Sequence, residues 1–324
     1  MTSPDATPTS PTLAAPAPPA SPVGLVSAAD KAAILVEALP YIRRFWGQVV
    51  VVKYGGNAFS AGSPDGAGGG EAEALASFAT DIVLMRSVGM RPLVVHGGGP
   101  QIGELMARLG KVPEFVDGLR VTDAETLDIA RMVLVGKVNR DIVSAINVHG
   151  PLAVGISGED AGLISARAKD PLLGFVGDVA AVNPDLLVRL LAEDLIAVVA
   201  TIGSDSTGQA YNINADTVAG AIAEALEATK LVYLTDVDGI RLDRDDPSTR
   251  LSSATAAQLA DLISTGVVDG GMIPKVRSCV RAVESGVAHA HILDGRQAHA
   301  LLLEIFTREG VGTMVTRDEE ERGR

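Results

Sequence analysis

VVVVKYGGNAF, at residues 49–59, combines a run of valines with a lysine and two glycines. The valines favour a buried strand, because β-branched side chains pack well on a sheet that is covered on both faces. Lys53 follows them, and Gly55 and Gly56 lack the side chains that would keep backbone N–H groups away from an anion. The stretch therefore predicts a phosphate-binding turn at the end of a strand. A glycine turn beside one lysine also occurs where nothing binds, so a second such turn is needed.

PLVVHGGGP, at residues 92–100, supplies that second turn, with an apolar run followed by three glycines. A dinucleotide-binding G-x-G-x-x-G pattern starting at Gly97 would need glycine at position 102, where Ile102 stands. The P-loop pattern G-x-x-x-x-G-K-[ST] does not occur in the sequence. A Rossmann oxidoreductase and a P-loop nucleotide site are therefore disfavoured.

The composition limits the kinds of binding partner and the cellular compartment that are expected for the protein. A formal net charge of −13 argues against nucleic acid or an anionic membrane surface as the main partner. No apolar run reaches the ~18 residues of a membrane span. The single cysteine, Cys279, cannot form an intramolecular disulfide, which favours a reducing, cytoplasmic location. Residues 1–26 are rich in Pro and Ala and predict a disordered tail rather than a targeting peptide.

Apolar runs alternate with stretches of helical period along most of the chain. The spacing predicts a helix over residues 28–46, and Thr122 and Glu125 are spaced as a capping box for a helix that continues to about Asn147. A hairpin is expected around Asp170. The alternation predicts an α/β fold, with a mostly parallel sheet covered by helices on both faces and ligands at the carboxyl ends of the strands.

Polar residues gather in three further places. Asn212, Asn214 and Asp216 occupy alternate positions and share one side of an extended segment; a helix cap would explain one of them but not three. Arg120 precedes a helix and suits a carboxylate, although a surface salt bridge would explain it equally well. Lys275 follows two glycines at the positive end of another predicted helix.

Two lysines and two glycine turns together suit phosphoryl transfer. The charge on the moving group must be neutralised while the donor and acceptor oxygens are held in line. A carboxylate acceptor, with a pKa near ~4, is already ionised at neutral pH and needs no general base. The sequence therefore favours a kinase acting on a carboxylate.

Five motifs in order resemble the acetylglutamate kinases, and the resemblance covers about residues 31–316. They are KYGGN at 53–57, HGGG at 96–99, GLRVT at 118–122, NINAD at 212–216 and GMIPK at 271–275. The resemblance implies the amino-acid kinase fold, a three-layer α/β/α sandwich, and ATP-dependent phosphorylation of the γ-carboxylate of N-acetyl-L-glutamate, the second step of arginine biosynthesis. It implies an N-terminal helix at 27–47, an acetylglutamate-binding lobe at 48–201, an ATP-binding lobe at 202–318 and an acidic tail at 319–324.

The resemblance also assigns roles to residues. Lys53 and Lys275 would stabilise the transferring phosphoryl group, with Asp216 orienting them. The residues expected to bind acetylglutamate and the phosphoryl group are Gly56, Gly98, Gly99, Arg120, Asn212 and Asn214. Those expected to bind ATP are Gly55, Thr235, Asp236, Asp238 and Gly239. Magnesium is expected to accompany ATP, without a dedicated metal cage in the protein.

The C-terminal pattern HILDGR at 291–296, followed by Glu304 and Gly310, is similar to the arginine-sensitive branch of these kinases. That similarity implies feedback inhibition by L-arginine and a hexamer, a trimer of dimers linked by the N-terminal helix. The residues expected to bind arginine are Tyr41, Lys230, His291, Glu304 and Gly310. Without the motif, an ordinary polar pair between a strand and a helix would explain His291 and Glu304.

Two departures and two rival functions remain open. The glycine-rich insertion at 62–70 could alter a substrate lid, and Glu159 stands where many relatives have lysine. Another carboxylate or carbamate kinase of the same fold is one rival; aspartate and glutamate kinases often carry a further C-terminal domain, whereas this chain ends soon after GTMVTR. The other is an arginine sensor that has lost turnover, which the presence of both lysines and Asp216 disfavours.

Overall fold

The structure is a computed structural model that describes residues 27–55, 70–268, 270–307 and 310–318. The chain divides into two compact units, Met1–Leu39 and Pro40–Arg324, and helix α1 (Ala28–Phe45) crosses the boundary between them. A helix is thus present where the spacing predicted one. Gly56, the tails at 1–26 and 319–324, and the insertion apart from Gly70 lie outside the described residues.

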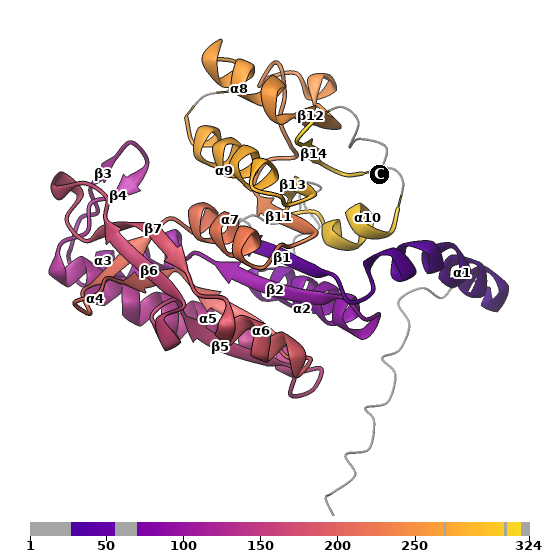
Figure 1. Cartoon of the computed structure of the whole chain (residues 1–324), viewed down its shortest axis with the longest axis horizontal. Coiled ribbons are helices and arrows are strands. Elements are labelled where there is room, and N and C mark those ends of the chain that lie inside the picture. The colour runs from indigo at the N-terminus through magenta and orange to yellow at the C-terminus, as the bar shows by residue number, and fades with distance from the viewer. Residues whose placement is uncertain (1–26, 56–69, 269, 308–309, 319–324) are drawn as a thin grey trace, which may run out of the picture. The chain divides into compact units, whose positions relative to one another are not determined.

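Eight strands of the second unit form one sheet in the order β12-β14-β13-β11-β1-β2-β8-β5 (Figure 1). Their bounds, in that order, are Ser253–Thr255, Thr313–Thr316, His289–Asp294, Lys230–Thr235, Val49–Tyr54, Arg91–His96, Ile196–Ala200 and Ala153–Ser157. Neighbouring strands are parallel except for the β13–β14 pair. The prediction of a mostly parallel sheet is confirmed.

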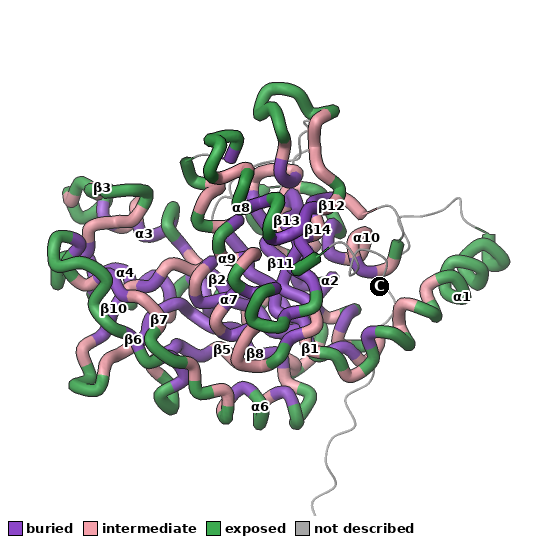
Figure 2. Tube along the Cα trace, turned by 45° about the horizontal axis from the view of Figure 1, so that its top comes forward, coloured by how far each residue is buried: buried purple, intermediate pink, exposed green. Residues whose placement is uncertain are grey.

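Alternate valines of β1 point into different cores, because successive side chains of a strand face opposite sides of the sheet. Val50 and Val52 pack in one core and Val51 in the other. The first core is completed by α2 (Glu71–Ser87), α3 (Gly99–Arg108), α4 (Ala124–Arg131), α5 (Asn139–Asn147) and α10 (Ala300–Phe306). The second is completed by α6 (Asp185–Ala192), α7 (Ala215–Ala225), α8 (Ala256–Ser264) and α9 (Met272–Glu284). The sheet therefore lies between two helical layers, and most residues of its strands are buried (Figure 2).

A second, small sheet closes on itself and was not predicted. It contains β6 (Ile164–Ala168), β7 (Val176–Val182), β9 (Ile202–Ser204) and β10 (Ala210–Ile213). Strands β6 and β7 are antiparallel, which confirms the hairpin expected around Asp170. A two-stranded hairpin, β3 (Phe115–Val116) and β4 (Leu119–Arg120), projects Arg120.

The helix expected from Thr122 to Asn147 differs from its prediction in two ways. Asp123 is the N-cap of α4, because its carboxylate accepts a hydrogen bond from the Thr126 N–H at 2.8 Å. The predicted capping box is therefore wrong; the Thr122 hydroxyl instead donates to the Arg120 carbonyl at 2.8 Å. A π-helical segment, Met132–Val138, also separates α4 from α5.

Among the residues that the structure describes, three short 3₁₀ helices lie in the connections of the second unit. They span Asp160–Gly162, Pro171–Leu173 and Pro247–Thr249. Within the described ranges, no helix has both the length and the apolar character needed to cross a membrane.

Candidate active site

The carboxyl ends of β1, β2 and β11 open into a cavity of about 280 Å³. Lys53 and Gly55 line it from β1, Gly97 to Pro100 from the β2–α3 turn, and Thr235 and Asp236 from the end of β11. Further lining residues come from the β3–β4 hairpin, from β10 and the start of α7, and from α9: Phe115, Gly118, Leu119, Arg120, Asn212, Ile213, Asn214, Ala215 and Lys275. Residues far apart in sequence thus meet at the edge of the sheet where the strand pattern predicted a ligand.

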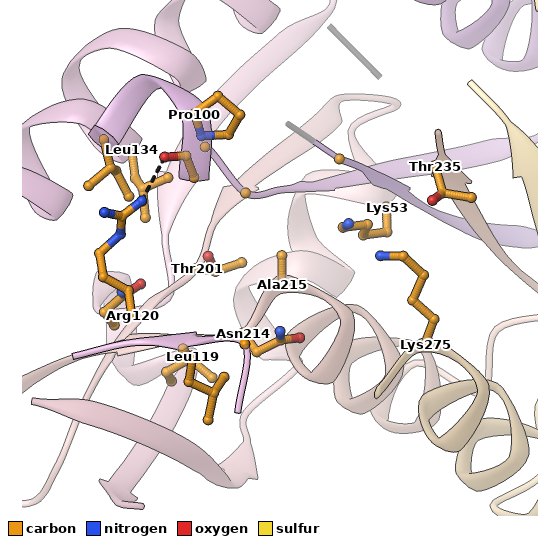
Figure 3. Close-up of a pocket in the computed structure, with 18 of the residues that line it drawn as sticks. Lys53, Pro100, Leu119, Arg120, Leu134, Thr201, Asn214, Ala215, Thr235 and Lys275 are labelled. Carbon is orange, nitrogen blue, oxygen red and sulfur yellow. Dashed lines mark hydrogen bonds between the residues drawn. The ribbon is translucent and has the colours of Figure 1, made fainter. Parts of the chain in front are cut away.

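Asp216 joins the two lysines. Its Oδ1 atom lies 2.8 Å from Lys53 Nζ, and its Oδ2 atom lies 2.9 Å from Lys275 Nζ. Lys53 reaches this position because it is on the same face of β1 as Val51, the face covered by α7 and α9. The two amino groups lie close together at one end of the cavity (Figure 3). The structure therefore brings together the three residues expected to act in catalysis.

Burial and mutual attraction set the charges of this group. Burial acts to raise the pKa of Asp216, but the charges of Lys53 and Lys275 outweigh it and lower that pKa to about 2. Burial lowers the pKa of Lys53, opposed by Asp216 and reinforced by Lys275. At neutral pH the carboxylate of Asp216 is ionised, and this single carboxylate is shared by two amino groups. Two amino groups beside one carboxylate suit the binding of an anion.

The β2–α3 turn requires glycine for reasons of space. A Cβ atom on Gly98 would lie 2.8 Å from Leu134 Cδ2 and 3.1 Å from Val138 Cγ2, whereas one on Gly99 would meet nothing within 4 Å. Gly98 is the N-cap of α3, and the first N–H groups of a helix have no intrahelical acceptor. These N–H groups suit an anion in the cavity.

Arg120 lies on the side of the cavity away from the lysines (Figure 3). Its Nη2 atom donates to the Gly99 carbonyl at 2.8 Å, and its guanidinium carbon lies 4.8 Å from the centre of the Phe115 ring. Among the described residues, no carboxylate lies within ion-pair distance of Arg120. A positioned guanidinium without a carboxylate partner in the described chain suits the carboxylate of a ligand.

Asn212 and Asn214 both line the cavity, and Asn214 also has a structural task. Its side-chain oxygen accepts hydrogen bonds from the Asp216 and Thr217 N–H groups, so Asn214 is the N-cap of α7. Capping thus accounts for Asn214, while Asn212 on β10 and Asp216 are left for other roles.

A second cavity of about 530 Å³ adjoins the first, since Thr235, Asp236 and Lys275 line both. Asp238 and Gly239 line the second cavity, as expected for the nucleotide, whereas Gly55 lines the first. Arginines that the sequence analysis did not assign to this place also line it: Arg241, Arg244 and Arg296. The two cavities, with Lys275 at their junction, offer room for two reactants.

A sequence model described as the amino acid kinase family matches residues 48–294. The chain belongs to this family. Acetylglutamate kinase of Symbiobacterium thermophilum is 55% identical over 299 residues, which make up 90% of this chain and 99% of that protein. The enzyme of the same name from Moorella thermoacetica is 50% identical, over 90% of this chain and 98% of that protein. The protein is therefore a kinase, and both of these relatives are acetylglutamate kinases.

Solved structures agree with this family fold. N-acetylglutamate synthase from Neisseria gonorrhoeae, complexed with coenzyme A and N-acetyl-glutamate, matches with a TM-score of 0.76 and 28% identity, over 89% of this chain and 63% of that chain. The same synthase complexed with coenzyme A and L-arginine matches with a TM-score of 0.74, over 89% of this chain and 65% of that chain. Carbamate kinase from Giardia lamblia, at 17% identity and a TM-score of 0.61 over 84% of this chain and 99% of that chain, shares the fold.

Three residues that the kinase was expected to use for arginine form a buried chain. Lys230 Nζ lies 2.9 Å from His291 Nε2, and His291 Nδ1 lies 2.7 Å from Glu304 Oε1. Because lysine only donates, His291 accepts at Nε2 and carries its proton on Nδ1, facing Glu304. Burial and Lys230 lower the pKa of His291 to about 4, so it is neutral at pH 7. Burial also lowers the pKa of Lys230, to about 8, against the attraction of Glu304.

The other two residues expected at this place lie differently. A Cβ atom on Gly310 would lie 3.4 Å from a carboxylate oxygen of Glu304, so Gly310 is adjacent to the cluster. Tyr41 lies on α1 and makes no polar contact with the described residues. The sequence analysis did not single out the ring of Phe45, whose centre lies 5.2 Å from Lys230 Nζ. Glu159 pairs with Arg131 at 3.0 Å and does not line the first cavity.

Proposed function

We propose that this kinase transfers the γ-phosphoryl group of ATP to the γ-carboxylate of N-acetyl-L-glutamate, giving an acyl phosphate and ADP in the second step of arginine biosynthesis. The observation that carries the proposal is the sequence identity of 50% and 55% to two acetylglutamate kinases, over 90% of this chain in each case. The two lysines bridged by Asp216 between two cavities support it. A cytoplasmic location fits the single buried cysteine.

The acceptor fits the first cavity, which the proposed acetylglutamate-binding lobe at 48–201 lines together with residues of the second lobe such as Asn212 and Lys275. Arg120 would pair with the α-carboxylate of acetylglutamate, and Asn212 would hydrogen-bond its polar groups. The γ-carboxylate would then lie between the glycine turns and the lysines. Because this carboxylate is already ionised at neutral pH, no residue has to remove a proton from it.

The nucleotide fits the second cavity, assigned to a lobe at 202–318 and lined by Thr235, Asp236, Asp238 and Gly239. Lys275 at the junction would meet the γ-phosphoryl group from this side and Lys53 from the other. Charge on that group spreads over its three equatorial oxygens during transfer, so two fixed cations stabilise the transition state more than the ground state. Asp216 would keep both cations in place before the reactants arrive.

Magnesium would enter with the nucleotide. The described parts of the chain contain no group of three or more His, Cys, Asp or Glu side chains that could hold a metal ion. Mg²⁺ commonly keeps several waters and binds through substrate phosphates with one or two carboxylates. Asp236, which lines both cavities, could supply one such carboxylate, and the ion would neutralise phosphate charge.

We also propose inhibition by L-arginine at the Lys230–His291–Glu304 cluster. Glu304 would pair with the guanidinium of the ligand and Lys230 with its carboxylate. The synthase structure that holds L-arginine supports a role for this ligand in related chains. Tyr41 would close over the ligand, and Gly310 would leave room beside Glu304.

We also propose that α1 links dimers into a hexamer, a trimer of dimers, because apolar side chains of this helix are exposed. Ile34, Leu35 and Val36 are between 58% and 69% exposed, and Leu39 is 48% exposed. Contiguous exposed apolar residues of this size indicate a protein interface. The partner would be the same helix of another copy.

One coupled assay of ADP release tests the reaction. Wild-type protein receives ATP, Mg²⁺ and either N-acetyl-L-glutamate, L-glutamate or L-aspartate, each with and without L-arginine. We expect turnover with N-acetyl-L-glutamate alone and a decrease when arginine is added. Preferred turnover of a free amino acid would support a different carboxylate kinase. Arginine binding without any turnover would support a sensor that has lost catalysis.

A further inference from the structure

Behind the β2–α3 glycine turn lies a buried polar network that touches neither cavity. His96 is the last residue of β2 and Asn139 the first of α5, and both are fully buried. Asn139 Nδ2 lies 3.1 Å from His96 Nε2 and 2.8 Å from the Val198 carbonyl oxygen. Arg140 donates a hydrogen bond from Nη2 to Asn139 Oδ1. Every polar atom of the Asn139 side chain is therefore paired.

These contacts determine where the proton of His96 lies. Arg140 only donates, so the atom of Asn139 that faces it must be the oxygen, and the amide nitrogen faces His96. An amide nitrogen donates, so His96 Nε2 accepts and the single ring proton lies on Nδ1. Nδ1 is 3.0 Å from the Gly97 carbonyl oxygen, to which it donates. Burial, with a smaller effect of Arg140, lowers the pKa of His96 to about 4 and keeps the ring neutral.

The Gly97 carbonyl in turn fixes the next N–H group. In a trans peptide the C=O and the following N–H point in opposite directions. Because His96 holds the Gly97 carbonyl, the Gly98 N–H points away from His96. Gly98 and Gly99 line the first cavity, so the orientation of this one peptide decides whether a donor is available there.

The helix behind the turn contacts it in two ways. Leu134 and Val138, in the π-helical segment, limit the space beside Gly98, and Asn139 follows immediately. π-helical turns inside helices occur frequently at functional sites. Gly155 on β5 leaves room for the amide, since a Cβ atom there would lie 1.8 Å from Asn139 Oδ1. The π-helical segment, α5 and β5 together hold the hydrogen bond between Asn139 and His96 in place.

We propose that His96 and Asn139 are positioning residues that aim the Gly98 N–H into the cavity, where the acceptor carboxylate and the phosphoryl group meet. Asn139 holds His96 in the Nδ1–H form, and His96 holds the Gly97–Gly98 peptide. The inference rests on the proposed function, because the donor acts on the acceptor or the transferring group. The hydrogen bonds that link the Asn139 amide, the His96 ring and the Gly97 carbonyl can be tested apart from that function.

A matched pair of variants at position 96 separates positioning from folding. The amide nitrogen of asparagine occupies the place of the imidazole Nδ1, so His96→Asn keeps a donor for the Gly97 carbonyl. The amide of glutamine extends toward the place of Nε2, so His96→Gln loses that donor. We expect kcat to fall about 10²- to 10³-fold in His96→Gln, the scale for loss of a preorganised donor, and to fall much less in His96→Asn. The KM for ATP should change little in both, and the exposed His149→Asn serves as control.

A spectroscopic measurement tests the network without relying on turnover. Long-range ¹H–¹⁵N spectra of the wild-type protein at neutral pH should show the imidazole of His96, assigned by its loss in His96→Asn, as the neutral Nδ1–H form. Asn139→Asp places an acceptor against Nε2, so the proton should move to Nε2 or the ring should become charged. The kcat should fall by about the same factor as in His96→Gln.

The outcomes are distinct. A wild-type His96 in the Nε2–H form would overturn the proposal whatever the substrate is. Equal kcat values in His96→Asn and His96→Gln, with both variants folded, would overturn it as well. If the wild-type enzyme does not phosphorylate acetylglutamate, the proposed function fails, while the Nδ1–H signal and its change in Asn139→Asp still support the network.

Discussion

Asp216 places one carboxylate oxygen against each of two lysines, Oδ1 against Lys53 and Oδ2 against Lys275. Its side chain is nearly buried, and so is that of Lys53. A buried carboxylate between two cations is held in its ionised form, as the lowered pKa of Asp216 shows. Loss of either lysine would still leave Asp216 one partner, which allows each lysine to be tested without an uncompensated buried charge.

Lys275→Ala should lower turnover strongly and leave the fold intact. The variant keeps the Lys53–Asp216 ion pair but removes the cation at the junction of the two cavities. We expect kcat to fall by about 10²- to 10³-fold, as for other preorganised charges at a transition state. Steady-state kinetics and circular dichroism provide the measurements. Lys137→Ala, at an exposed lysine paired with Asp141, is the control, and an unchanged kcat in Lys275→Ala would contradict the two-lysine mechanism.

Lys230 gives the proposed arginine inhibition a pH dependence. Its pKa in the folded protein is lowered from 10.5 to about 8, mainly by burial, so Lys230 is charged below that value and neutral above it. The contact with the ligand carboxylate should therefore weaken as pH rises through about 8. We expect the inhibition constant to rise about tenfold, the scale of one charge-assisted hydrogen bond.

The measurement is arginine inhibition of ADP release on both sides of that pH. Arginine should inhibit the Lys230→Met variant only weakly at every pH. Any pH dependence of inhibition that remains in this variant reports the titration of arginine itself. An identical pH profile in the two proteins would rule out Lys230 as the titrating group.

Elements approach each other closely where glycine permits it. Among the described glycines whose surroundings are known, the one at the β13–β14 pair makes the tightest approach to backbone. A Cβ atom on Gly312 would lie 2.1 Å from the Ile292 carbonyl oxygen, and a backbone oxygen cannot rotate away as a side chain can. By contrast, Gly136 in the π-helical segment has nothing within 4 Å of such an atom. The two positions form a matched pair.

Gly312→Ala should destabilise the protein, because the strands must separate to admit one methyl group. Overpacking of this kind costs about 1–3 kcal/mol. Gly136→Ala should be neutral or stabilising by up to about 1 kcal/mol, since alanine favours the helix. Thermal and denaturant unfolding measure both, and equal stability of the two variants would show that the β13–β14 pair accommodates the methyl group.

The elements differ in how far the sequence predicted them. Strand β1 was predictable because four valines leave few alternatives to a buried strand, and the alternation with helices then indicated the parallel sheet. The choice of Asp123 over Thr122 as N-cap was not, because both residue types cap helices and neighbouring contacts decide between them. The π-helical segment has no pattern of its own in MVLVGKV. Its Leu134 and Val138 pack beside Gly98, a contact with a distant part of the chain that the sequence pattern does not reveal.

The site follows the same division. Lys53, Asp216 and Lys275 could be named from motifs, because chemistry restricts those residue types. His96 and Asn139 act on the backbone, so only the geometry of the folded chain links them to the cavity. The second cavity also has arginines in surface turns, Arg241, Arg244 and Arg296. The periodicity of the sequence does not predict how these turns fold.

At the scale of the whole molecule, the exposed apolar residues of α1 are the feature that a single chain leaves without explanation. Leu35 and Leu39 are four residues apart and share one face of the helix. Water contact with such a face is unfavourable, at roughly 25 cal/mol for each Å² of apolar surface. Association of copies through α1 would remove this cost.

The double substitution Leu35→Asp with Leu39→Asp should therefore change the assembly without unfolding the kinase. Charges facing each other across two copies of α1 repel, so we expect hexamers to separate into dimers and arginine inhibition to weaken, while turnover without arginine remains. Sedimentation equilibrium gives the mass, and the coupled assay gives the inhibition. Glu37→Gln, at an exposed position of the same helix, is the control and should remain hexameric. A double variant with the mass and inhibition of the wild type would remove α1 from both the assembly and its regulation.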